Sequence, residues 1–336
     1  MAPKSLLVAL FFVVRALAKP VLWDGRAPFN FTSVNLDASA DPYLSVVKGS
    51  NKASHYTQLL GNTSNSTPLW SPDRSLPQPI GPGGPVQITP SQAPHLELIE
   101  QVIAVSIDNS SVFVPGGNTA NSQYGFRRTE LLAQRNSDWH NLLPDTQTGI
   151  TVFHFSIKLD PAKPLNYNHE YQIVFIEPSD GSHVFGIQLG SPFTNPTGTL
   201  PVANAHDLKV LDHAKKILYT AAFTADVWHN LAVQVDWSKK TLAVLYSKDG
   251  AELQAVTKAL PNSSAASGST GQGEFHFGVL KLPLVNPRDT NDHKNDVVHY
   301  GTQEGTTEGL LYSGIFIEST KDGVSIGNGR SIPLIV

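Results

Sequence analysis

The chain contains no cysteine among its 336 residues. Without cysteine no disulfide bond can form, so a hydrophobic core must stabilise the fold. The same absence excludes cysteine nucleophiles, thiolate metal sites and a small disulfide-bonded cellulose-binding module.

Charge is also scarce. Charged residues make up 15% of the chain, the formal net charge is −4, and no run of basic residues is longer than a pair. These features argue against a nucleic-acid partner and against binding to an anionic membrane surface. Apolar residues make up 40% of the chain, which is enough for a core and argues against global disorder.

Only the N-terminal stretch resembles a targeting signal. Lys4 precedes an apolar run at 6–14, and a small-x-small sequence follows at 16–18. This arrangement predicts a signal peptide over residues 1–18, with the mature chain beginning near Lys19. An apolar run of this length is too short to cross a bilayer as a helix. We therefore expect a secreted, extracellular protein without a membrane anchor.

Sequons for N-linked glycans agree with export. We expect two or three of them to be used, each on a surface loop. The five asparagines are Asn30, Asn62, Asn65, Asn109 and Asn262.

Short alternating segments with frequent turns dominate the rest of the chain, which has 24 prolines and 26 glycines. No stretch gives a convincing helical pattern. The expected strands are 101–114 with an interruption at 108–109, 125–132, 151–159, 171–176, 184–189, 209–220, 230–237, 241–247, 274–282 and 309–317. This pattern predicts an all-β fold, a β-jelly roll or concanavalin-like two-sheet sandwich with a concave substrate cleft.

The same pattern predicts one catalytic domain over residues 19–336. The stretch 62–95 is rich in Pro and Gly and is expected to form a long surface loop. The tail at 321–336 is either a final edge strand or a loose end.

Strand alternation places polar side chains on one face of several strands, amid aromatic and aliphatic neighbours. A concave carbohydrate groove needs such a face. The outward polar residues are Arg128 and Glu130, Glu170 and Gln172, Gln188, and His276.

Glu130 and Glu170 are the best-placed carboxylates for cleaving a glycosidic bond. That reaction needs one group that protonates the leaving oxygen and another that activates water or attacks carbon. Each residue also has a structural interpretation. Glu130 could form an ion pair with Arg127 or Arg128, and Glu170 could be a solvated residue at a strand end. Glu177 precedes a proline and is expected in a loop.

Histidine and tryptophan supply further candidates for substrate binding. His276 and His229 could hydrogen-bond sugar hydroxyls, although a core-lining histidine satisfied by the backbone is the alternative for each. Trp139 and Trp70, both in predicted loops, are candidate platforms for stacking sugar rings. The sequence shows no metal-ligand spacing and no Gly-x-Ser-x-Gly motif, so we expect neither a metal nor another cofactor.

Several of these segments, in order along the chain, resemble glycoside hydrolase family 131, a family of fungal secreted β-glucanases. They lie at 21–26, 127–131, 169–172, 228–237, 275–283 and 312–318. The resemblance implies a β-jelly roll with an open cleft and hydrolysis of β-1,3-, β-1,6- and β-1,4-linked glucans by inversion. The stretch 62–95 departs from the family pattern and could reshape the rim of the cleft.

In that family the suspected catalytic carboxylates match Glu130 and Glu170. We expect Glu130 to be the general acid and Glu170 the general base, with the reverse assignment open. For inversion their carboxyl groups should lie roughly 6.5–9.5 Å apart. Arg128, Gln172, Gln188 and His276 would then bind substrate or tune the pair.

Two rival interpretations remain. Residues 128–131 also resemble the jelly-roll alginate lyases, in which an arginine neutralises a uronate; a lyase would leave an unsaturated, UV-absorbing product. Few basic residues on the predicted groove strands argue against a uronate. A non-catalytic glucan-binding cell-wall protein would release no sugar at all. We expect a β-glucan as the partner and a monomeric protein.

Overall fold

The computed structural model describes residues 21–61, 100–193, 198–327 and 329–336. The predicted signal peptide, the sequons at Asn62 and Asn65, the predicted loop at 62–95 and the candidate platform Trp70 lie outside these ranges. Among the described residues, no helix is long and apolar enough to cross a membrane, and no group of acidic and histidine side chains could hold a metal ion.

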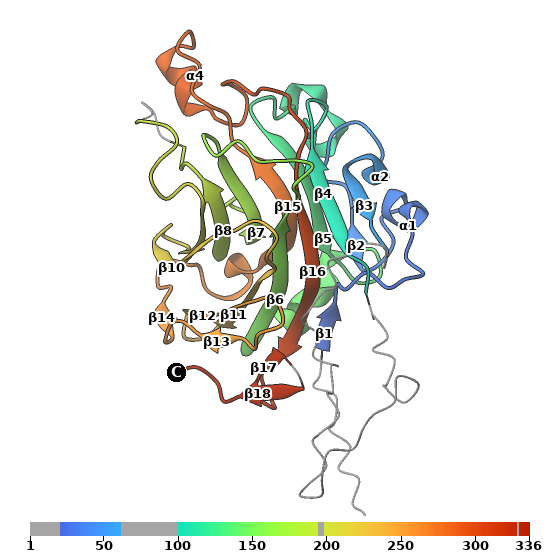
Figure 1. Ribbon diagram of the computed structural model, residues 1–336, viewed down its shortest axis with the longest axis vertical. Coiled ribbons are helices and arrows are strands. Elements are labelled where there is room, and N and C mark those ends of the chain that lie inside the picture. The colour runs from blue at the N-terminus through green and yellow to red at the C-terminus, as the bar shows by residue number, and fades with distance from the viewer. Residues whose placement is uncertain (1–20, 62–99, 194–197, 328) are drawn as a thin grey trace, which may run out of the picture.

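Two large antiparallel sheets form the body of the molecule (Figure 1). One has nine strands, in the order β13-β12-β11-β6-β16-β4-β3, with β1 paired to β16 and β14 paired to β12. Its strands are β1 (Val21–Asp24), β3 (Thr57–Leu59), β4 (Ile103–Ile107), β6 (Ile150–Leu159), β11 (His229–Asp236), β12 (Thr241–Lys248), β13 (Gln254–Ala255), β14 (Leu260–Pro261) and β16 (Glu308–Ser319).

The other sheet has seven strands, in the order β10-β9-β8-β7-β15-β5-β2. They are β2 (Tyr43–Leu44), β5 (Arg127–Ala133), β7 (Glu170–Pro178), β8 (Phe185–Gly190), β9 (Asp207–Asp212), β10 (Ile217–Ala222) and β15 (Gly273–Lys281). Two further strands, β17 (Val324–Gly327) and β18 (Arg330–Ile332), pair only with each other.

Helices among the described residues are short and lie outside the sheets. The α-helices are α1 (Ser33–Asp37), α2 (Ala53–Tyr56), α3 (Leu143–Thr146) and α4 (Asn291–Asn295), and the 3-10 helices are η1 (Pro115–Gly117), η2 (Thr119–Asn121), η3 (Trp139–Leu142) and η4 (Gly268–Gly271). Figure 1 shows α1 and α2 beside β3 at one edge and α4 at one end of the molecule.

The core lies between the two sheets, and strand alternation decides which side chains fill it. In β6, Phe153 and Phe155 are buried in the core, and in β15 so are Phe275 and Phe277. Phe153 meets Phe275 edge to face, with ring centroids 5.0 Å apart. Burying each of these side chains contributes about 1.5–3 kcal/mol, so the core can stabilise the fold without disulfides. The predicted two-sheet, all-β fold is confirmed.

Two predictions about strands are wrong. Residues 110–114, expected to continue the strand beyond its interruption, form no strand. The segment expected as a single strand over 209–220 divides into the antiparallel hairpin β9–β10. The carboxylate of Asp212 accepts the backbone N–H of Lys216 at 2.8 Å, and Lys215 has a φ of +61°. These features form the turn between β9 and β10. The apolar residues before and after it do not predict a turn.

The C-terminal tail is neither an edge strand of a large sheet nor loose. The hairpin β17–β18 brings Val324 and Ile326 onto a small apolar cluster with Val152 and Phe316 of the nine-stranded sheet. The hairpin therefore covers part of the outer face of that sheet.

The three described sequon asparagines differ in exposure. Asn30 and Asn109 are exposed. Asn262 is 3% exposed, its Nδ2 donates to the Val184 carbonyl at 2.8 Å, and its Oδ1 accepts from the His213 N–H at 2.9 Å. A glycan would occupy that nitrogen and needs open surface. The expected glycan at Asn262 is therefore incompatible with this fold.

Candidate active site

The outer face of the seven-stranded sheet carries the polar side chains expected to line a cleft. On β15, Phe275 and Phe277 point into the core while His276 points outward, and on β5 Glu130 lies opposite the core residue Leu131. A pocket of about 130 Å³ lies on this face over β7, β8 and β9. The outer polar residues fall into two groups, one around Glu130 and one around Glu170.

Glu130 is held by two cations. Arg128 donates from Nε to Oε1 at 2.8 Å and from Nη2 to Oε2 at 2.7 Å, so this ion pair is bidentate. Protonated His276 donates from Nδ1 to Oε2 at 2.6 Å. The Glu130 side chain is 0% exposed, because these two partners cover it. The ion pair with Arg128 that the sequence allowed is therefore present.

These contacts fix the charges of Glu130 and His276. Burial alone would raise the pKa of Glu130, but the charges and hydrogen bonds of Arg128 and His276 lower it to about 2. Burial alone would lower the pKa of His276, but hydrogen bonds to Glu130 and Glu274 raise it to about 9. Near neutral pH, Glu130 is a carboxylate and His276 an imidazolium. In that state Glu130 has no proton to give, which favours the reverse of the two open role assignments.

Three stacked rings connect this group to the pocket. The ring of His276 stacks on Phe175 with centroids 4.7 Å apart, and Phe175 stacks on His183 at 4.2 Å. Burial lowers the pKa of His183 to about 4, so that imidazole is neutral. His183 also lines the pocket. The stack therefore links the pocket wall to the charged group through ring contacts.

Glu170 lines the pocket together with Gln172, Gln188 and His183. Its Oε1 accepts from Nε2 of Gln172 at 2.9 Å, and its Oε2 accepts from the backbone N–H of Phe193 at 2.6 Å. The structure therefore brings together the three pocket residues that strand alternation assigned to one face.

The two glutamates come from strands that are not neighbours. Strand β15 lies between β5, which carries Glu130, and β7, which carries Glu170. Glu130 pairs with Gly278 of β15, and four residues further along the chain the N–H of Leu282 donates to the carbonyl of Glu170. Strands lie about 4.8 Å apart and rise about 3.3 Å per residue, which puts the two Cα atoms on the order of 15 Å apart. The side chains therefore reach the cleft from separate positions.

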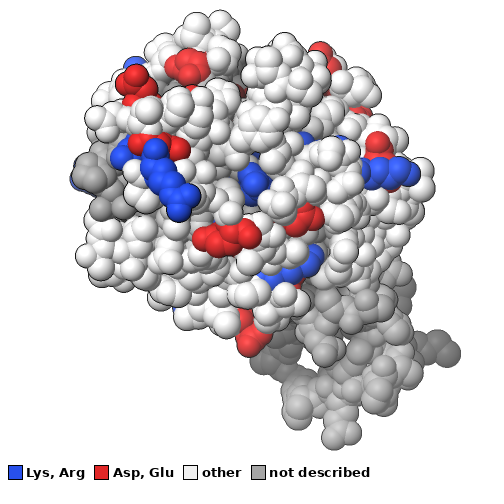
Figure 2. Space-filling model, turned by 90° about the horizontal axis from the view of Figure 1, so that it is seen from above, with Lys and Arg blue, Asp and Glu red and all other residues white. Residues whose placement is uncertain are grey.

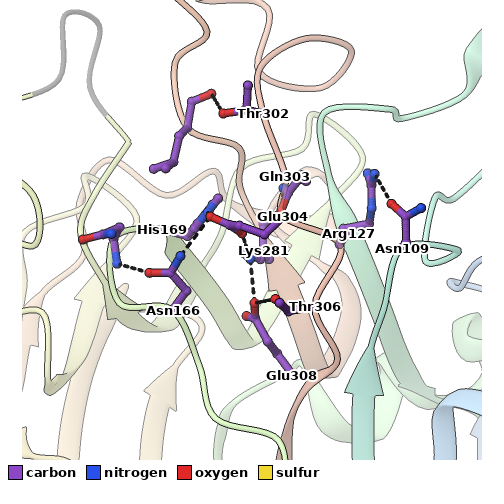
Figure 3. Close-up of polar contacts among 12 residues, drawn as sticks. Asn109, Arg127, Asn166, His169, Lys281, Thr302, Gln303, Glu304, Thr306 and Glu308 are labelled. Atoms are coloured by element: carbon purple, nitrogen blue, oxygen red, sulfur yellow. Dashed lines mark hydrogen bonds and ion pairs between the residues drawn. The ribbon is translucent and has the colours of Figure 1, made fainter.

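A largely buried charge network fixes the backbone just before Glu170 (Figure 3). Lys281 donates from Nζ to Glu304 and to Glu308, each at 2.7 Å. His169, the residue before Glu170, contacts Glu304 through Nε2 at 2.7 Å. Breaking a buried pair of this kind costs more than a surface pair contributes. The network thus holds the start of β7 and the segment around Glu304 in one arrangement.

Glu177 belongs to the site, although the sequence placed it in a loop. It is the second-last residue of β7 and pairs with Glu274 of β15. Its Oε2 lies 3.8 Å from Nε2 of His276 and 3.9 Å from Nη2 of Arg128. Burial raises the pKa of Glu177, against the lowering effects of these two cations.

A β-bulge explains why Glu177 lies on the outer face. The register between β7 and β8 shifts between Gln172 and Val174. An extra residue in one strand reverses the alternation beyond it. Phe175, expected in the core, instead joins the outer stack, and Glu177 follows it outward.

Two candidate substrate-binding residues lie elsewhere. His229 is fully buried in β11 of the nine-stranded sheet, where its Nδ1 bonds the Tyr246 hydroxyl at 2.7 Å. Trp139 stacks on His140 and borders a small hollow lined by Phe275 and Ile317, which are core residues. His229 cannot reach a substrate in the cleft, so that prediction is wrong, and Trp139 does not line the Glu170 pocket.

Comparisons with known proteins agree with this fold. The family model described as the glycoside hydrolase 131 catalytic N-terminal domain matches residues 21–323. A search of curated proteins gave no match.

Two solved structures have the same fold. One is the catalytic domain of the glycoside hydrolase family 131 protein from Coprinopsis cinerea, with 23% identity, a TM-score of 0.59, and coverage of 93% of this chain and 99% of that one. The other is a GH131 β-glucanase catalytic domain from Podospora anserina, with 21% identity, a TM-score of 0.61, and coverage of 93% and 100%.

Proposed function

Because the chain belongs to glycoside hydrolase family 131, a β-glucanase family, we propose that it hydrolyses β-1,3-, β-1,6- and β-1,4-linked glucans by inversion. The chain is therefore a glycoside hydrolase, and the lyase and binding-protein alternatives are set aside. Arg128 also fits a lyase poorly, because its guanidinium is engaged by Glu130 instead of being free to neutralise a uronate.

One observation supports the proposed site most strongly: Glu170 lines a pocket on the outer face of the seven-stranded sheet with Gln172 and Gln188. Amide groups of this kind donate and accept hydrogen bonds, as sugar hydroxyls require. Figure 2 shows the molecule from above the view of Figure 1, and on that face acidic and basic side chains lie scattered among uncharged ones.

The charge of Glu130 favours the reverse of the expected roles. Glu170 would protonate the glycosidic oxygen as the bond from that oxygen to C1 breaks. Water would add to C1 from the other face and give up its proton to the carboxylate of Glu130. Glu130 lies beneath Arg128 and His276, so one of these side chains has to move aside for water to reach it.

Inversion is proposed because the family resemblance implies it. In inverting enzymes the two carboxyl groups lie about 6.5–9.5 Å apart, and in retaining enzymes about 5–5.5 Å. Here the two glutamates stand two strands apart, with Cα atoms on the order of 15 Å from each other, a separation that is compatible with the wider spacing.

Secretion is part of the proposal. The signal-peptide pattern at 1–18 supports it, and the exposed asparagines Asn30 and Asn109 are suitable glycan acceptors. We propose an extracellular monomer that acts on wall glucans.

The stereochemistry of the first product tests the mechanism. We expect proton NMR during hydrolysis of a β-glucan oligosaccharide to show the α-anomer of the new reducing end before mutarotation. A β-anomer appearing first would mean retention and would remove Glu130 as the base for water. Running laminarin, pustulan and cello-oligosaccharides in parallel shows which linkages are cleaved.

A further inference from the structure

Glu177 is a partly exposed carboxyl group that receives no hydrogen bond from any residue in the described ranges. Its side chain is 29% exposed. The nearest donors, Arg128 and His276, are 3.9 and 3.8 Å away, beyond hydrogen-bond distance. The oxygens of Glu177 can therefore accept hydrogen bonds from another molecule.

The charges around Glu177 leave it the least compensated acid of its group. Three carboxylates, those of Glu130, Glu177 and Glu274, share the two cations Arg128 and His276. Glu130 takes three hydrogen bonds from these cations, and Glu274 accepts from Nε2 of His276 at 3.1 Å. Glu274 also stands directly opposite Glu177 in the sheet. Like charges in that position destabilise a sheet, so folding alone gives no reason for an acid here.

Glu177 borders the same surface as the pocket. It lies two residues beyond Phe175, whose ring stacks on His183 at the wall of the pocket and on His276 beside Glu130. A sugar chain bound across this face would pass from the Glu170 pocket to Glu177.

We propose that Glu177 is a substrate-binding residue whose exposed carboxyl group hydrogen-bonds a ring hydroxyl of a glucosyl unit bound beside the Glu170 pocket. The inference rests on the proposed function and extends it. A neutral glucan offers hydroxyl donors at this position, whereas a polyuronate would bring further negative charge. Glu177 thereby selects for uncharged polysaccharide at this end of the cleft.

The Glu177→Met variant separates binding from folding. We expect kcat/KM on the best wild-type glucan to fall about tenfold or more, mainly through KM, because a hydrogen bond to a charged group is lost. The Tm at pH 7 should stay the same or rise, since a poorly compensated carboxylate is removed. The Glu177→Gln variant should recover part of the binding, because its amide can still bond a hydroxyl.

Glu252→Gln is the matched control. Glu252 pairs with the exposed Arg330 away from the cleft, and its substitution should change neither KM nor Tm. The proposal is overturned if Glu177→Met leaves KM unchanged, or if activity falls only in step with a falling Tm. If wild-type protein cleaves no glucan, the proposed function itself fails, which is a different result.

Discussion

Replacing either Glu130 or Glu170 with glutamine is expected to lower glucan hydrolysis by about 10²–10⁴-fold, the usual contribution of a positioned acid or base. Glutamine keeps the size of the side chain but can neither donate a proton as an acid nor accept one as a base at neutral pH. The measurement is kcat/KM on the best wild-type glucan, with folding checked by circular dichroism.

The two variants should differ in stability. Glu130→Gln leaves Arg128 and His276 without a buried counter-charge, and breaking a buried pair in this way costs about 3–5 kcal/mol. Glu170→Gln can still accept the Phe193 N–H, so a smaller loss is expected. Near-wild-type activity in a folded Glu170→Gln variant would remove Glu170 from the mechanism.

The protein is expected to be most stable in an intermediate range of pH, and to lose stability at lower pH because of Glu130 and at higher pH because of His276. The pKa of Glu130 is lowered to about 2 in the folded state. Its stabilising contribution is therefore present above the unfolded value of about 4.3 and is lost as the pH falls toward 2. The pKa of His276 is raised to about 9. Its contribution is complete below about 6.5 and is lost as the pH rises through 9.

Urea unfolding at a series of pH values checks the alkaline side. Raising the pKa of His276 from about 6.5 to about 9 corresponds to about 3 kcal/mol of folding free energy. Because His276 and Glu130 titrate as a coupled pair, this free energy belongs to both groups. We expect wild type to lose stability between pH 6.5 and 10, and His276→Gln to lose about 3 kcal/mol less over that range. His229→Gln is the control, because burial lowers the pKa of His229 to about 4 and the residue is already neutral there. Equal alkaline slopes in wild type and His276→Gln would contradict the charge assigned to His276.

The sequence predicts the sheets and the outward-facing polar residues because both follow from local alternation. Phe153 and Phe155 of the nine-stranded sheet face the core. Glu130 and His276 lie together on the outer face of the seven-stranded sheet. Both placements follow from the period of two along a strand. The family resemblance adds the assignment of the two glutamates, which alternation alone leaves open between catalysis and ion pairing.

The features that the sequence does not predict depend on contacts between distant segments. The bulge beside Gln172 changes the face of the sheet on which Glu177 lies. No residue type in β7 predicts that bulge. The ionisation of Glu130 depends on His276, which lies 146 positions away along the chain. The sequence around Asn262 predicts an exposed glycosylation site, but the side-chain amide of Asn262 donates a hydrogen bond to the carbonyl of Val184. Local patterns carry no information on such pairings.

Reducing-sugar release by the wild-type protein tests the central claim most directly. The substrates are laminarin, pustulan and soluble cello-oligosaccharides, and the products are also monitored for ultraviolet absorbance. We predict release of reducing sugar from at least one of these glucans, without an unsaturated product. A well-folded protein that releases no sugar from any of them would contradict the assignment of this cleft to glucan hydrolysis.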